Sequence, residues 1–100
     1  MVRHVILWKL KEELTEEEKR KVKREAKEHL EGLVGVVPGL RELHIHTEGL
    51  ASSNTDMMLD ALLDDETALK GYAVHPDHVA AAGTYVAPYA AVRSCFDYEI

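Results

Sequence analysis

Residues 2–10 are expected to form a strand that needs cover on both of its faces. Most of these residues favour β structure. The side chains on both sides are largely apolar, with His4, Ile6 and Trp8 pointing one way and Val5 and Leu7 the other. A strand that is apolar on both sides has both faces packed against other elements. The fold must therefore supply a layer on each side of this strand.

A helix is predicted from about residue 16 to residue 34. Thr15 and Glu18 have the spacing of a capping box, in which the threonine accepts from first-turn amides and the glutamate reaches back to the helix start. Gly35 and the Pro38-Gly39 turn end the helix. One narrow stripe of the helix is apolar and is expected to be buried: Val22, Ala26, Leu30 and Leu33.

Three further strands and two short helical segments follow. Residues 40–48 alternate between apolar and polar side chains, which predicts a strand with one wet face. Residues 56–63 and 92–100 are the other expected strands. Between these two, a short helix ends before Pro76, and a second segment continues from Pro76 to about Tyr85. The order βαββα(α)β predicts an α+β ferredoxin-like protomer, with a four-stranded antiparallel sheet and helices on one face.

Helices on one face leave the other face of the sheet uncovered. Val5 and Leu7 cannot meet the chain's own helices if Ile6 and Trp8 do. A second copy packed sheet to sheet is the natural cover, so we expect a homodimer. One hundred residues, 46% of them hydrophobic, suit a single domain spanning 1–100, and a domain of this size gains stability from oligomerisation.

Charge and cysteine content exclude several classes of partner. The net charge of −6 and the pI near 5.4 argue against binding to nucleic acid or to an anionic membrane, because both favour a basic protein surface. Much of the basic run 19–27 is expected to form a salt-bridged solvent face, with Arg20 and Lys21 four residues after Glu16 and Glu17, and no aromatic residue in the run could stack on bases. The single cysteine, Cys95, is expected to pack. With no internal disulfide, signal peptide or membrane segment recognisable, a cytoplasmic location is expected.

The stretch 71–79 holds the best candidates for acid–base chemistry. Tyr72 and His78 are six residues apart, so on an unbroken helix they would point about 240° apart and could not meet. Pro76 breaks the helix and makes convergence possible. A neutral His78 could then take a proton from a carbon next to a ketone, while the Tyr72 hydroxyl donates to the enolate oxygen. The alternative is structural, with Tyr72 and His75 only fixing the turn.

A pocket between sheet and helices would be lined by His4, Ile6 and Trp8 from the first strand and by His75 from the inter-helix turn. A lone histidine on such a strand is more often a hydrogen-bonded core residue, so His4 is included only as a pocket residue. His75 is the weaker candidate, since capping of the second helical segment is its expected role. Trp8 is large, and a pocket filled by its ring is the alternative.

His44 and His46 form an H-x-H pair on one strand face, flanked by Glu42 and Glu48. A structural Zn²⁺ site normally has four protein ligands, and this run supplies two good ones. A solvated polar face is therefore the preferred interpretation. We expect neither a metal ion nor another cofactor.

Several short motifs together resemble one known family. They are His4-Val5 in the first strand, Lys9 near its end, Val37-Pro38-Gly39, Tyr72 with His75-Pro76-x-His78, Val86-x-Pro88 and Asp97-Tyr98. This combination is similar, along nearly the whole chain, to the stress-responsive dimeric α/β-barrel (Dabb) domain family. The resemblance implies two ferredoxin-like protomers whose sheets join into a barrel.

The resemblance also extends to a site. In that family the plant enzyme olivetolic acid cyclase closes a linear poly-β-ketone by an intramolecular aldol step without a cofactor. Tyr72 and His78 are similar in type and spacing to its catalytic pair, and His4 resembles its first-strand histidine. This implies a site more than it implies a substrate.

Three functions are open from the sequence. The first is a homodimer that binds a small organic molecule in a pocket of each protomer. The second is a cofactor-independent cyclase or isomerase with His78 as base and Tyr72 as hydrogen-bonding acid. The third is a stress-related assembly protein in which the barrel matters and the pocket has no role.

Overall fold

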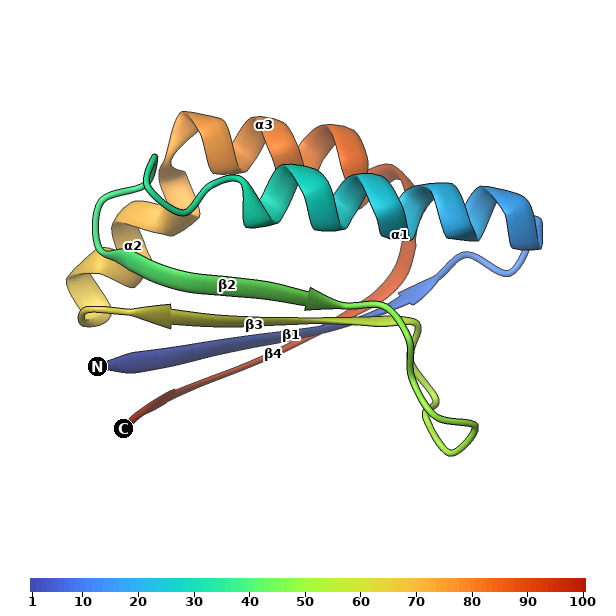
Figure 1. Ribbon diagram of the computed structural model, residues 1–100, viewed down its shortest axis with the longest axis horizontal. Helices are drawn as coiled ribbons and strands as arrows, with labels where there is room; N and C mark the ends of the chain where they lie inside the picture. Colours follow the sequence, from blue (N-terminus) through green and yellow to red (C-terminus); the bar gives the residue numbers. More distant parts are fainter.

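The computed structural model describes all of residues 1–100 and contains one four-stranded antiparallel sheet (Figure 1). Its strands lie in the order β2-β3-β1-β4. The predicted ferredoxin-like order of strands and helices is confirmed. The strands are β1 (Val2–Leu10), β2 (Leu40–His46), β3 (Met57–Leu63) and β4 (Ala90–Glu99).

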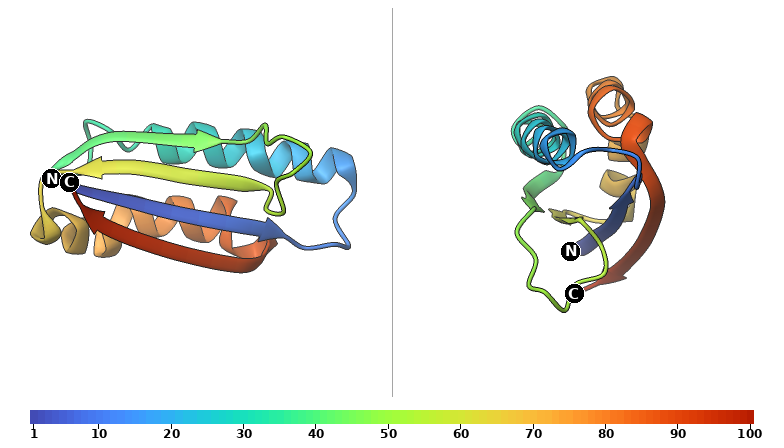
Figure 2. Two further views of the ribbon diagram at one scale, coloured as in Figure 1. Left: turned by 90° about the horizontal axis from the view of Figure 1, so that it is seen from below. Right: turned by 90° about the vertical axis from the view of Figure 1, so that its right-hand side faces the viewer.

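The helices all lie on one face of this sheet. In Figure 1 α1 and α3 are above the strands and α2 is beside the left ends of β2 and β3, and in the left panel of Figure 2 the strands stand in front of the helices. None of these helices is both long enough and apolar enough to cross a membrane. They are α1 (Glu16–Glu31), α2 (Glu66–Val74), α3 (Pro76–Tyr85) and the short 3-10 turn η1 (Ala87–Tyr89), which leads into β4.

A capping box starts α1, and a hydrogen bond to the sheet holds its last turn. The Glu18 amide donates to the Thr15 hydroxyl at 3.1 Å, and the Thr15 amide donates to the Glu18 carboxylate at 2.9 Å, which confirms the predicted capping box. The helix ends at Glu31, short of the predicted end near residue 34. The Glu31 carboxylate accepts from the Ile45 amide of β2 at 2.9 Å, so the last turn is tied to the sheet.

The core lies between the covered face of the sheet and the helices. Alternate residues of β1 are buried there, and Ile6 and Trp8 are 2% and 5% exposed. Removing such side chains from water is the main source of folding free energy. β3 adds Met57, Leu59, Ala61 and Leu63, and α1 adds Val22, Ala26 and Leu30 from its predicted stripe.

The open face of the sheet carries apolar side chains around one ion pair, between Arg3 of β1 and Asp60 of β3. Val5 of β1 lies opposite Phe96 of β4, and Leu7 lies opposite Met58 of β3. Residues directly opposite on antiparallel strands share a face. Phe96 is 70% exposed, and no helix lies on this side of the sheet (Figure 2). No helix of the chain therefore covers this face, and only the loop after β2 approaches it, beside Leu7.

Two strand boundaries are shifted by a loop contact and by the 3-10 turn. Asp56 was expected to begin β3, but its carboxylate accepts from the Leu10 amide at 2.7 Å and its own amide donates to the Trp8 carbonyl at 2.8 Å. β4 begins at Ala90, directly after η1, and not at Val92.

Candidate functional site

The junction of α2 and α3 positions two of the candidate residues. His75 has an extended backbone, with φ −62° and ψ 131°, and Pro76 occupies the first turn of α3. The chain therefore changes direction between the two helices. Across this bend the rings of Tyr72 and His78 lie with their centroids 4.1 Å apart. The structure thus brings together two side chains that a continuous helix would separate.

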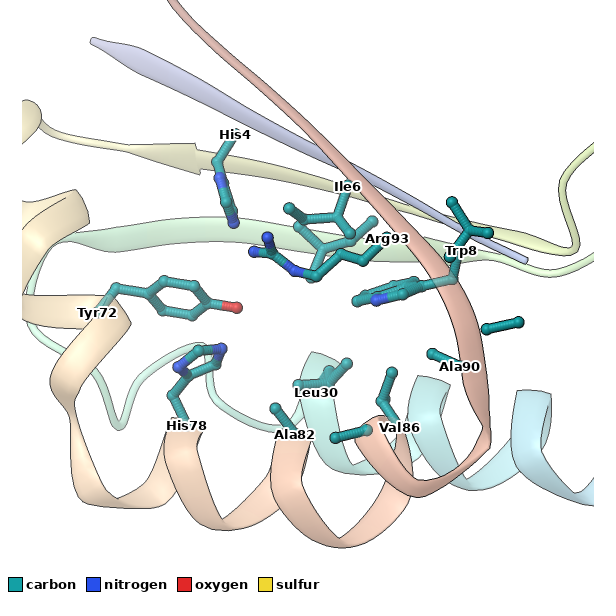
Figure 3. Close-up of a pocket in the computed structure, with 14 residues that line it drawn as sticks. His4, Ile6, Trp8, Leu30, Tyr72, His78, Ala82, Val86, Ala90 and Arg93 are labelled. Atoms are coloured by element: carbon teal, nitrogen blue, oxygen red, sulfur yellow. The ribbon is translucent and has the colours of Figure 1, made fainter. Parts of the chain in front are cut away.

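Tyr72 and His78 face a cavity of about 320 Å³ between the sheet and α3 (Figure 3). His4, Ile6 and Trp8 of β1 lie on its wall, so Trp8 leaves the space open and does not fill it. The remaining wall is mostly apolar and consists of Leu30, Leu59, Ala82, Val86, Ala87, Ala90, Ala91, Val92 and Arg93.

His75 does not line this cavity, so its assignment to the pocket wall was wrong. Its Nδ1 accepts from the Asp77 amide at 3.1 Å and caps the N-terminus of α3. A side chain used in this way points along the backbone of the next turn and away from the cavity. The expected capping role of His75 is the one that the structure contains.

Tyr72 places a hydroxyl in the interior without a partner. The residue is 1% exposed, and its hydroxyl oxygen forms no hydrogen bond. Burial raises the pKa of Tyr72 well above its usual range, and the positive charge of Arg93 opposes this only in part. The hydroxyl therefore stays protonated and can donate a hydrogen bond to a group in the cavity.

His78 is half-buried beside Tyr72. Burial lowers its pKa below the usual value of 6.5, and the neighbouring His4, Arg93 and His75 act in the same direction. Its Nδ1 lies 3.4 Å from the Ala73 carbonyl oxygen, which can only accept, so we assign the proton to Nδ1. The Nε2 atom of the neutral ring is then free to accept a proton.

His4 is the third ring of the cluster. It is 6% exposed, its ring centroid lies 5.7 Å from that of Tyr72, and the two rings meet edge to face. Its Nδ1 donates to the Asp97 carboxylate at 2.5 Å. This bond orients the ring and leaves Nε2 on the cavity side. His4 is thus both a hydrogen-bonded core residue and a cavity residue.

Comparison with known proteins identifies the family. The family model described as the stress responsive A/B barrel domain matches residues 2–100. This chain belongs to that family. No functionally curated protein sequence matches the chain.

Solved structures similar to this A/B barrel domain share its fold along almost the whole chain. A dimeric protein of unknown function with a ferredoxin-like fold from Bacteroides fragilis is 32% identical, with a TM-score of 0.92 over 99% of this chain and 95% of that chain. A dimeric ferredoxin-like protein of unknown function from Thermobifida fusca is 28% identical, with a TM-score of 0.81 over 99% and 90% of the two chains. A similar dimeric protein from Jannaschia is 26% identical, with a TM-score of 0.78 over 99% and 98%.

Two residues of the site in this A/B barrel domain were missed from the sequence. Arg93 lines the cavity opposite Trp8 on the neighbouring strand. Asp97 lies opposite His4 and holds its ring. The alternation of β4 does place both residues on one face, and only the register of β4 against β1 identifies their neighbours. The alternation of side chains within β4 does not determine this register.

Cys95 also differs from its prediction. It was expected to pack, but it is exposed, and its Sγ donates to the Asp97 carboxylate at 3.5 Å. Burial and the adjacent carboxylate raise the pKa of Cys95, so it stays a thiol. The atoms of His4, Cys95 and Asp97 that could bind a metal ion lie within 4.8 Å of one another. Because His4 and Asp97 already bond each other directly, we assign this group to orientation of the His4 ring.

His44 and His46 lie on the polar side of β2, with ring centroids 6.4 Å apart. No third ligating side chain converges on them, since the one group of three in the chain is elsewhere. The structure adds nothing that would favour a metal site over a solvated polar face on this strand.

Proposed function

We propose that this A/B barrel domain is a homodimer in which each protomer binds a small organic molecule in the cavity beside Tyr72. The observation that carries the proposal is the buried Tyr72 hydroxyl, which has no partner and belongs to a residue on the wall of a mostly apolar cavity. A buried polar group without a partner costs about 1–3 kcal/mol, so its presence calls for an explanation. A hydrogen-bonded ligand provides one.

The cavity has the properties of a small-ligand site. Its volume of about 320 Å³ lies at the lower end of the range for ligand pockets. Apolar side chains cover most of the wall, and a few polar groups, Tyr72, His78 and His4, converge on one end of it (Figure 3). This distribution favours a ligand with an apolar body and one polar end.

The dimer is supported by the open face of the sheet and by relatives. Val5, Leu7 and Phe96 lie on the face of the sheet that no helix of the chain covers. The similar proteins from Bacteroides fragilis and Thermobifida fusca are described as dimeric. Two copies that face each other through this surface would bury it on both sides.

Ligand binding is tested by NMR titration of the isotope-labelled chain with 1-phenylbutane-1,3-dione, an acidic ketone, and with phenol. We expect saturable shifts of the backbone amides around Tyr72, His78 and Ala82. A Tyr85→Phe variant serves as a control and should show the same shifts as the unmodified chain, because Tyr85 also lies on a helix but stacks on His29 away from the cavity. Shifts spread evenly over the surface, or none at millimolar probe, would contradict the proposal.

A second candidate is an enzyme without a cofactor. It is favoured by a neutral His78, which can accept a proton, beside a protonated Tyr72, which can donate a hydrogen bond. His78 Nε2 would take a proton from the carbon next to a ketone, and the electron pair of the C–H bond would move to the ketone oxygen. The Tyr72 hydroxyl would donate to this enolate oxygen. The enolate carbon would then attack a second carbonyl of the same molecule, or regain a proton at another position from protonated His78.

This candidate predicts a one-sided pH profile. Because the pKa of His78 is lowered, kcat/KM should rise with pH below 6.5 and be level above it. Because the pKa of Tyr72 is raised, no alkaline fall should appear up to about pH 10. Proton exchange of 4-phenylbutan-2-one in D₂O, followed by NMR, measures this. Exchange equal to the protein-free rate, or a rise centred above pH 6.5, would contradict it.

A further inference from the structure

Arg93 is the one side chain on the cavity wall that carries a permanent charge. A guanidinium stays protonated at every physiological pH. The other polar side chains on the wall are Tyr72, His4 and His78. Figure 3 shows the Arg93 guanidinium directed into the space beside Ile6, toward the end of the cavity that holds His4 and Tyr72.

No acidic group of the chain neutralises Arg93. None of the ion pairs of the chain includes it, and none of the side-chain hydrogen bonds does. Asp97, on the same face of β4, is the obvious candidate, but it accepts from His4. The positive charge of Arg93 also acts on both Tyr72 and His78, which is consistent with its place beside them.

Two donors without a partner therefore face one space: the Arg93 guanidinium and the buried Tyr72 hydroxyl. The acceptor beside them, Nε2 of neutral His78, carries no charge and so cannot neutralise the guanidinium. The complementary ligand group has several acceptor sites and a negative charge. A carboxylate meets this requirement, because its two oxygens match the paired N–H groups of a guanidinium and leave a lone pair for a third donor. Trp8 and Val86 line the apolar part of the cavity, where the rest of the ligand would lie.

We propose that Arg93 and Tyr72 together bind a carboxylate, so that the cavity selects small organic acids with an apolar body. This inference rests on the proposed ligand-binding function of the same cavity. Arg93 is exposed at the mouth of the cavity, so the attraction is partly screened by water and should weaken as salt is added.

The test is calorimetric titration of the full chain with 4-phenylbutanoate and with 4-phenylbutanamide, which share one apolar body. The acid should bind at least about tenfold more tightly than the amide. Arg93→Gln should remove this preference, so that acid and amide bind about equally, and Arg93→Lys should keep part of it. Arg20→Gln is the matched control, since Arg20 is an exposed arginine of α1 that forms no ion pair.

The outcomes separate the two proposals. Equal binding of acid and amide by the unmodified chain, or a preference that survives Arg93→Gln, overturns the carboxylate assignment while ligand binding in the cavity stands. Failure of both probes to bind overturns the carboxylate assignment together with the proposed function. Circular dichroism melting of Arg93→Gln identifies any loss of binding that comes from unfolding.

Discussion

Tyr72→Phe is expected to make the protein more stable and its cavity less functional. The substitution keeps the ring that packs in the core and removes a buried hydroxyl that has no partner. Removing an unsatisfied buried donor relieves its desolvation penalty, so the free energy of unfolding should rise by about 1 kcal/mol. The same change should weaken ligand binding about three- to tenfold, because one hydrogen bond to the ligand is lost.

Under the enzymatic candidate the effect of Tyr72→Phe is larger. Loss of a donor to a developing oxyanion lowers kcat by about 100-fold or more. Urea denaturation and probe titration on the same preparation measure both quantities. Tyr85→Phe, the control, should change neither binding nor turnover. If Tyr72→Phe instead lowers stability and leaves binding intact, Tyr72 has a structural role alone.

Leu7→Asp is expected to convert a dimer into a monomer. Leu7 lies at the centre of the open face, between Met58 and Ser94 on the two neighbouring strands. A symmetric interface would contain two copies of the new carboxylate, each without a partner, at about 3–5 kcal/mol per buried charge. The dimer dissociation constant should therefore rise by more than about a thousandfold.

Two further variants make the dimer test specific. Phe96→Asp acts on the same face at a residue that is 70% exposed, so the protomer should still fold. Val79→Asp places the same charge on α3 at a residue that is 54% exposed and away from the sheet, and it should leave the dimer intact. Analytical ultracentrifugation at micromolar concentration distinguishes the species. A monomeric unmodified chain, or a dimeric Leu7→Asp variant, would refute the interface.

Features of this fold with local causes could be predicted from the sequence. The capping box of α1 depends on Thr15 and Glu18 alone, and the break between α2 and α3 depends on the ring of Pro76. The alternation of β1 was sufficient to separate Val5 and Leu7 from Ile6 and Trp8. In each case the residues that fix the structure are neighbours in the chain.

Features that depend on distant contacts could not be predicted. The bond that ties the last turn of α1 to β2, from the Ile45 amide to the Glu31 carboxylate, joins residues of two separate elements. The pairing of His4 with Asp97 joins residues from the first and last strands. The open space beside Trp8 depends on how all the side chains of the wall fill their shared volume. The sequence therefore indicated the candidate pair Tyr72 and His78 but missed Arg93 and misplaced His75.

A crystal structure of the chain with 1-phenylbutane-1,3-dione tests most directly whether the cavity beside Tyr72 is a ligand site. We predict a ligand oxygen at about 2.7–3.2 Å from the Tyr72 hydroxyl, with the phenyl ring against Trp8. An empty cavity at saturating probe, a Trp8 ring turned to fill it, or a ligand bound only elsewhere on the surface would contradict the account.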